Sequence, residues 1–148
     1  MSASLQTVHL RQVLDFQFDV DFGSPVPPLR ADEPAPLGQG NGPSPVQLLA
    51  SAVGNCLSAS LLFALRKFKQ RPEPLSCEVH AEVGRNAEGR LRVLGMTAKL
   101  TLGVHGQVLE HLDRVLGTFE SYCTVTQSVS AGIPVEVQVF DAGGARLK

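Results

Sequence analysis

Apolar and polar residues alternate in the N-terminal part of the chain. Between residues 8 and 22 the pattern sets Phe16, Phe18, Val20 and Phe22 against Gln17, Asp19 and Asp21. Alternation of this kind predicts a half-buried strand, and we expect a hairpin partner to precede it. Residues 23–42 are rich in proline and glycine, which predicts an ordered loop rather than a linker between domains.

A long apolar segment without a charged residue follows between Pro43 and Leu65. Ser44 is a candidate N-cap, because Pro45 stands at the first helical position and Gln47 completes a capping box. The segment therefore predicts a helix that begins next to Ser44. Basic residues near its end complement the helix dipole, and prolines beyond them stop the helix: Arg66, Lys67, Lys69, Pro72 and Pro74.

This helix reaches the length at which a membrane span becomes a candidate, but polar residues recur along it. At about 100° per residue, a polar stripe and an apolar side lie opposite one another. The stripe consists of Gln47, Ser51, Asn55 and Ser58, and the apolar side of Leu49, Ala52, Cys56 and Phe63. We therefore expect a helix packed in the centre of the molecule, and no association with a membrane.

The second half of the chain changes from strand to helix and back. The segments 75–82 and 91–102 predict two strands joined by a turn at residues 86–89. Apolar spacing predicts a helix over residues 107–119, a short helix over 123–131 and a closing strand over 134–140. Segregated strands and helices of this kind indicate an α+β fold. We expect a single domain over residues 1–148.

The charge balance excludes several classes of partner. Lysine and arginine total 13 against 14 aspartates and glutamates, a net charge of -1, so no basic surface for nucleic acid or anionic lipid is expected. The first residues show no basic stretch followed by an apolar run, which indicates that a secretory signal is absent and favours a cytoplasmic location.

The chain contains three cysteines, Cys56, Cys77 and Cys123. Their odd number and wide spacing argue against a disulfide scaffold and against a structural zinc site. Cys56 falls in the middle of the long helix, whereas Cys123 opens the short helix, a position that favours thiolate. Cys77 shares one strand face with Leu75 and Val79, so core packing is its expected role.

These motifs together resemble the OsmC/Ohr family, the osmotically inducible and organic hydroperoxide resistance proteins. The resemblance covers nearly the whole chain, including the order of its elements. It rests on Asp32-Glu33-Pro34 with Gly38 and Gly40, on the segment from Gly42 to Leu49 that leads to Cys56, and on Cys123 opening a helix ahead of Ile133 and Pro134.

The resemblance implies an OsmC-like α+β fold: N-terminal strands, a long central helix, and a second antiparallel strand set with two further helices. It also implies an intertwined homodimer with active sites at the subunit interface. In such proteins the helix cysteine attacks the peroxide, becomes a sulfenic acid and forms a disulfide with the second cysteine. Carried over, Cys56 is the peroxidatic residue, Cys123 resolves it, no cofactor is needed, and an external dithiol regenerates the pair.

One position departs from the family pattern. Many active members carry a glutamate ten residues before the helix cysteine, where it holds an arginine against the thiolate, and this chain has Val46 there. An arginine beside a thiol lowers the thiol pKa. Arg30, ahead of Asp32, is our candidate for that arginine, with Arg11 as an alternative, and Glu33 could replace the missing acid.

Two functions from different classes follow. The first is a thiol-dependent peroxidase that reduces small organic hydroperoxides through Cys56 and Cys123. The second is a protein of the same fold without peroxidase activity, which binds a small apolar molecule or senses redox state. Val46 and the unassigned arginine are the features that keep the second hypothesis open.

Overall fold

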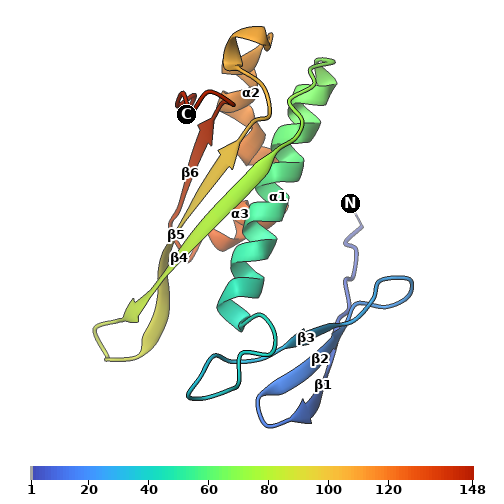
Figure 1. The fold of residues 1–148 in the computed structure, drawn as a ribbon, viewed down its shortest axis with the longest axis vertical. Coiled ribbons are helices and arrows are strands. Elements are labelled where there is room, and N and C mark those ends of the chain that lie inside the picture. Colours follow the sequence, from blue (N-terminus) through green and yellow to red (C-terminus); the bar gives the residue numbers. More distant parts are fainter. Residues whose placement is uncertain (1) are drawn as a thin grey trace. The chain divides into compact units, whose positions relative to one another are not determined.

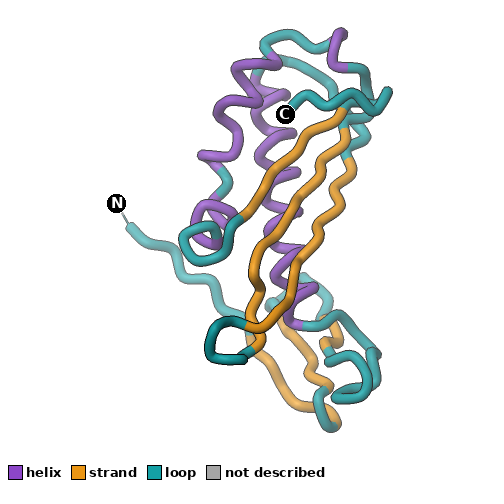
Figure 2. The backbone as a smooth tube through the Cα atoms, turned by 90° about the vertical axis from the view of Figure 1, so that its left-hand side faces the viewer, coloured by secondary structure: helices purple, strands orange, loops and turns teal. Residues whose placement is uncertain are grey.

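The computed structural model describes residues 2–148 (Figures 1 and 2). The chain divides into two units, the first extending to Leu48 and the second comprising Leu49–Lys148. This division does not test whether the two units form one domain, so the single domain expected over residues 1–148 stays a prediction. Two three-stranded sheets and a long helix give the mixed α+β architecture that the sequence predicts.

The first unit contains a sheet in the order β1-β2-β3. Strands β1 (His9–Leu14), β2 (Gln17–Asp21) and β3 (Leu29–Ala31) pair antiparallel. A hairpin is present, but both of its strands lie within residues 8–22, so the expectation of one strand over that range with a partner before it is wrong. The two strands join in a tight turn at Asp15, whose φ is 50°. The region expected to be loop throughout residues 23–42 contains β3, which sequence reasoning missed.

One face of this sheet is apolar and largely uncovered within its unit. Leu10, Val20 and Leu29 are in register across the three strands, and residues in register share a face. Val20 is 5% exposed, whereas Leu10 is 62% and Phe18 36% exposed. The alternation was read correctly, but the phenylalanines expected to be half-buried lie exposed, because three short strands cannot cover their own apolar face.

The loop after β3 is organised by the Asp32 carboxylate. It accepts hydrogen bonds from the backbone N–H groups of Glu33, Gln39 and Asn41 at 2.8, 3.2 and 3.0 Å. These bonds, the one from Asn41 first, lower the pKa of Asp32. A Cβ at Gly42 would come within 2.0 Å of the Arg30 carbonyl oxygen, so only glycine fits where the loop passes β3.

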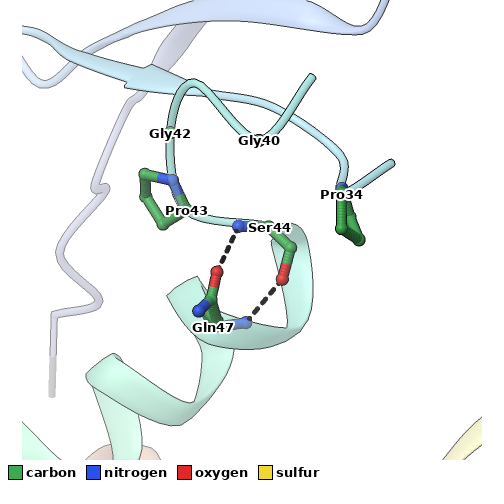
Figure 3. Close-up of a pocket in the computed structure, with 6 residues that line it drawn as sticks. All are labelled: Pro34, Gly40, Gly42, Pro43, Ser44 and Gln47. Atoms are coloured by element: carbon green, nitrogen blue, oxygen red, sulfur yellow. Dashed lines mark hydrogen bonds between the residues drawn. The ribbon is translucent and has the colours of Figure 1, made fainter. Parts of the chain in front are cut away.

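Helix α1 (Pro45–Lys67) begins with the predicted capping box (Figure 3). The Ser44 hydroxyl accepts the N–H of Gln47 at 3.2 Å, and the Gln47 side-chain oxygen accepts the N–H of Ser44 at 2.9 Å. Two backbone donors that the helix start leaves unpaired are thereby satisfied reciprocally.

The end of α1 differs in mechanism from the prediction. The helix closes with a Schellman motif, in which Gln70 N–H bonds to Leu65 O at 3.0 Å and Lys69 N–H to Arg66 O at 2.8 Å. Lys69 adopts a left-handed φ of 58°. The prolines expected to end the helix lie beyond this turn.

In the second unit α1 lies along one face of a mixed sheet (Figures 1 and 2). Strands β4 (Ser76–Arg85) and β5 (Leu91–Thr101) form the predicted hairpin, and β6 (Val135–Phe140) pairs parallel with β5. The expectation of a wholly antiparallel set is therefore wrong for β6. A parallel partner needs a crossover connection, and the intervening helices provide it.

A stripe of residues at four-residue spacing faces the sheet from α1. It consists of Val53, Leu57, Leu61 and Leu65, all fully buried. Their partners in the core include Met96, Ala98, Leu100, Val137 and Val139. The side of α1 that the sequence pattern predicted to be buried is therefore wrong. Phe63 of the predicted side is 72% exposed, and Ala52 is exposed as well.

The crossover between β5 and β6 is built from short helical pieces. These are the 3-10 turn η1 (Gly106–Val108), α2 (Leu112–Thr118), the 3-10 turn η2 (Phe119–Tyr122) and α3 (Thr124–Val129). The two predicted helices are present, although α2 begins later than expected. Val115, Leu116 and Phe119 join the core formed by α1 and the sheet.

Within residues 2–148, α1 is the one helix whose length and composition would allow it to cross a membrane. Its most apolar 18-residue window has a mean hydropathy of 1.8, and 28% of that window is buried. Length and composition alone are weak evidence, because the core helices of globular proteins meet the same criterion.

The capping box supplies a prediction about stability. Ser44→Ala should lower the free energy of unfolding by about 1 kcal/mol, because the N–H of Gln47 loses its acceptor. Ser44→Asp, which keeps an acceptor, should stay close to the wild type. Urea unfolding at one fixed protein concentration measures both changes, and an alanine variant as stable as wild type would contradict the role of the cap.

Candidate functional site

The structure brings two of the three predicted site residues together. Cys56 lies partly buried in the middle of α1, and Cys123 is fully buried at the residue that precedes α3. Both are free thiols, and they lie close enough together for Cys56 to raise the pKa of Cys123. They are 67 residues apart in the chain, so the contact is a product of the tertiary fold.

Helix α1 also anchors the segment that carries Cys123. The Ser60 hydroxyl, one helical turn after Cys56, donates to the Phe119 carbonyl oxygen at 2.8 Å. Phe119 is fully buried, and the Cys123 N–H bonds to the Glu120 oxygen at 3.0 Å. The η2 turn is thereby fixed against α1 beside the thiol pair.

The ionisation of Cys123 differs from the sequence expectation. Cys123 does open a helix, but burial, followed by the neighbouring Cys56 thiol, raises its pKa. A six-residue helix offers too little dipole to offset the loss of water around a thiolate. At neutral pH Cys123 is therefore the protonated thiol, and the expectation of a thiolate at this residue is wrong.

Thr126 is a partner of Cys123 that sequence reasoning missed. The Cys123 thiol donates to the Thr126 hydroxyl, with Sγ and Oγ1 3.0 Å apart, and Thr126 is only 4% exposed. A hydroxyl can rotate and donate instead, so it would stabilise a thiolate at Cys123, and its hydrogen bond lowers that pKa. The sequence did offer a signal for this contact, because the side chain at a helix start, here Cys123, can reach the residue three positions later, here Thr126.

Cys77 stands apart from the thiol pair. It lies on β4 and packs against the core, and a Cβ at Gly54 would be 3.4 Å from its sulfur. Burial raises the pKa of Cys77, while a hydrogen bond with Ser58 opposes that rise. Cys56 is two residues after Gly54 and therefore lies about 200° around the helix from the side that faces Cys77. Cys77 packs against the core, so the packing role predicted for it is confirmed.

Arg30, the third predicted site residue, lies on β3 in the first unit. Its Nε donates to Asp19 Oδ1 at 2.6 Å and its Nη1 to Gln17 Oε1 at 3.2 Å. The hydrogen bond with Asp19 raises the pKa of Arg30 and lowers that of Asp19. Arg11, the alternative candidate, lies on β1 in register with Asp19 of β2. A role for either arginine at Cys56 stays a prediction.

The acid that the family resemblance led us to look for is absent from the start of α1. Its first turn contains no acidic residue, in keeping with Val46. Glu33, considered as a replacement, lies half-buried in the Asp32 loop. Nowhere in residues 2–148 do three or more histidine, cysteine, aspartate or glutamate side chains gather in a way that could hold a metal ion.

Solved structures resemble this fold over more than nine-tenths of the chain. An OsmC-like protein of unknown function from Vibrio cholerae has a TM-score of 0.78 at 15% identity, covering 93% of this chain and 100% of its own. The organic hydroperoxide resistance protein OsmC from Legionella pneumophila has a TM-score of 0.71 at 16% identity, covering 93% and 98%. OhrB, the organic hydroperoxide resistance protein of Bacillus subtilis, has a TM-score of 0.70 at 16% identity, covering 92% and 98%.

Identities this low establish a shared fold only. A comparison with curated protein sequences finds no significant match. The family model for OsmC-like proteins, however, matches residues 38–138, which is more than half of the chain and includes both Cys56 and Cys123. The chain therefore belongs to the OsmC-like protein family.

Proposed function

We propose that this protein is a thiol-dependent peroxidase that reduces small organic hydroperoxides with Cys56 and Cys123. The observation that carries the proposal is the contact between the two thiols. Both cysteines are free thiols in the structure. Structures of the same fold include proteins named for organic hydroperoxide resistance, which supports the choice of substrate class.

The reaction has three steps. The Cys56 thiolate attacks the terminal oxygen of the hydroperoxide, the O–O bond breaks, and the alkoxide leaves as an alcohol after taking a proton. Cys56 is then a sulfenic acid. Cys123 loses its proton and attacks the Cys56 sulfur, so that an S–S bond forms and water leaves. An external dithiol finally reduces the disulfide and is itself oxidised, which restores both thiols.

The roles of the two cysteines follow from their surroundings. Cys56 is partly exposed and can meet a substrate, whereas Cys123 is fully buried and can be reached only by a group already attached to Cys56. A neutral, buried Cys123 does not compete for the peroxide. Arg30 is proposed to stabilise the Cys56 thiolate, and its pairing with Asp19 holds the guanidinium in one orientation.

We further propose that the protein acts as a homodimer in the cytoplasm. The exposed side of α1 carries small and apolar residues, among them Ala52, Ala59 and Phe63, and the β1-β2-β3 sheet leaves an apolar face uncovered within its unit. A second copy would bury both surfaces. A reducing compartment suits the proposal because both thiols must be regenerated.

One observation favours the alternative function, an OsmC-like protein that binds a small apolar ligand or senses redox state. The first turn of α1 lacks an acid to hold an arginine beside Cys56. Without that arrangement a thiol reacts slowly with peroxide. Turnover measurements separate the two functions.

The peroxidase proposal predicts different outcomes for the two cysteine variants. Cys56→Ser should abolish reduction of cumene hydroperoxide, because no sulfenic acid can form. Cys123→Ser should be oxidised once per subunit and then stop, and mass spectrometry should show sulfenic acid or higher oxides on Cys56. Cys77→Ser is the matched control and should turn over like the wild type.

Peptide mapping after one equivalent of peroxide should show a Cys56 to Cys123 disulfide in the wild type. A linkage through Cys77 would refute the resolving role of Cys123. Absence of turnover in a fully reduced wild-type protein supplied with a dithiol such as dihydrolipoamide would refute the peroxidase function and favour the alternative.

Thr126→Val should shift the pH dependence of disulfide formation. Thr126 lowers the pKa of Cys123, so its removal raises that pKa, and less of the reactive thiolate is present at a given pH. The rate of disulfide formation should therefore rise at a higher pH than in the wild type. Stopped-flow measurement after rapid oxidation of Cys56 tests this, with Thr126→Ser expected to restore the wild-type profile. An unchanged profile in the valine variant would show that the hydroxyl has no part in resolution.

The proposed dimer predicts that a charged side chain on the exposed side of α1 prevents association. Ala59→Arg should yield a monomer of 15.8 kDa by light scattering at micromolar concentration, since an arginine cannot be buried between two apolar helices without a partner. Ala87→Arg, in the turn between β4 and β5, should leave the dimer intact. A wild-type protein that is monomeric under these conditions would contradict the proposal.

A further inference from the structure

The η2 turn, which leads from α2 to Cys123, is held by the side chain of Lys148. The Lys148 ammonium donates to the Leu116 carbonyl oxygen at 2.8 Å and forms an ion pair with the Glu120 carboxylate. It also lies 5.4 Å from the centre of the Phe119 ring. Figure 1 accordingly shows the end labelled C close to α2. One cation therefore contacts three residues of the segment that precedes Cys123.

These contacts suit an ammonium group that is partly shielded from water. The last carbonyl groups of a helix lack partners within the helix, and a cation beside them is favourable. Lys148 therefore acts as a cap at the end of α2. The side chains of Lys148 and Glu120 are 32% and 29% exposed. Because salt and water screen a partly buried pair less than an exposed one, this ion pair restrains η2 more than a pair on the open surface would.

Glu120 connects this ion pair with the cysteine. Its carbonyl oxygen accepts the N–H of Cys123 at 3.0 Å and the side-chain amide of Gln127 at 3.1 Å. The residue that pairs with the ammonium thus also bonds to the backbone of Cys123 and to the helix that follows. The Ser60 hydroxyl of α1 binds the carbonyl group just before Glu120. The η2 turn is therefore fixed both by α1 and by Lys148.

The backbone that carries Lys148 is itself anchored. The Asp141 carboxylate accepts three backbone N–H groups at 2.9 to 3.0 Å, from Gly106, Gly143 and Ala145. After this turn, the N–H groups of Leu147 and Lys148 bond to the Val139 oxygen of β6 at 2.7 and 3.2 Å. The Leu147 side chain packs against the core. A contact with the Lys148 side chain therefore ties η2 to the sheet.

We infer that Lys148 is a positioning residue for Cys123, which through Glu120 and the end of α2 holds the η2 turn so that the Cys123 sulfur stays beside Cys56. The inference rests on the proposed resolving role of Cys123, but it concerns closure of the disulfide and not the attack on a hydroperoxide. Where η2 is already ordered in the dithiol form, closure costs little further loss of backbone freedom. Without Lys148 the dithiol form gains freedom, and the effective concentration of one thiol at the other falls.

A glutathione redox buffer measures this effective concentration in the full-length protein. Cys56 and Cys123 are oxidised to one disulfide, and oxidised glutathione takes up the two electrons and two protons and leaves as two molecules of reduced glutathione. The equilibrium constant of the exchange has the unit of a concentration. Alkylation of free thiols followed by peptide mass spectrometry gives the fraction of Cys56 that is linked to Cys123.

Lys148→Met keeps a side chain of similar length without the ammonium, and should lower this equilibrium constant about fivefold. Glu120→Gln leaves the backbone carbonyl in place and should lower it by a smaller factor. The double variant should match Lys148→Met, because both changes remove parts of one interaction. Lys148→Arg should restore most of the wild-type value. Lys99→Met is the matched control, since Lys99 also lies over an aromatic ring, that of Phe140 at 4.7 Å, but on β5, and it should leave the constant unchanged.

Two results would overturn the inference directly. These are a wild-type equilibrium constant in Lys148→Met, and a constant in Lys148→Arg as low as that of Lys148→Met. Urea unfolding of the reduced proteins separates positioning from general stabilisation. If Lys148→Met lowers the free energy of unfolding but leaves the equilibrium constant unchanged, Lys148 has a structural role only and the inference fails.

The buffer contains no peroxide, so the inference and the peroxidase proposal fail separately. A lowered constant in Lys148→Met supports the inference even where the wild type reduces no hydroperoxide. Turnover of hydroperoxide together with an unchanged constant overturns the inference and leaves the peroxidase proposal in place. A wild-type protein that forms no Cys56 to Cys123 disulfide in the buffer overturns the inference together with the resolving role of Cys123.

Discussion

The packing of one stripe of α1 against the β4–β6 sheet determines the position of every other part of the site. Val53, Leu57, Leu61 and Leu65 are all fully buried, and each contributes about 1.5–3 kcal/mol through its removal from water. Burial of this stripe fixes the rotation of the helix. Cys56, next to Leu57 in sequence, is thereby turned toward the edge of the core where η2 and α3 pack, and it meets Cys123 there.

The same rotation explains which thiol pairs with which. Gly54 and Ser58 are one turn apart and both face Cys77 on β4, while Cys56 lies between them in sequence and on another side of the helix. Glycine at position 54 allows this approach, because a Cβ there would come within 2.7 Å of the Val79 side chain. The close approach of helix and sheet thus places Cys77 in the core and on another side of α1 from the pair Cys56 and Cys123, for which reactivity is proposed.

Much of the fold could be predicted from local patterns. The capping box, the β4–β5 hairpin and the two short helices follow from residue spacing, since each depends on interactions between neighbours in sequence. The buried side of α1 could not, because small residues occur around its whole circumference and the apolar pattern does not select one side. The parallel pairing of β6 was missed for a related reason, since an isolated strand pattern carries no direction.

The chemistry of the site was less predictable than the fold. A cysteine at a helix start suggests a thiolate, but the sequence does not show that Cys123 is fully buried, and burial raises its pKa. The consequence is that the two thiols differ in exposure, since Cys123 is fully buried and Cys56 only partly. In the proposed reaction the partly exposed Cys56 meets the oxidant, and the neutral, buried Cys123 reacts only with the oxidised sulfur of Cys56. The Thr126 hydroxyl, at 3.0 Å from the Cys123 sulfur, can donate a hydrogen bond to that sulfur once the thiol has lost its proton. If Cys123 resolves the oxidised Cys56 as proposed, the first turn of α3 therefore influences the pH at which it does so.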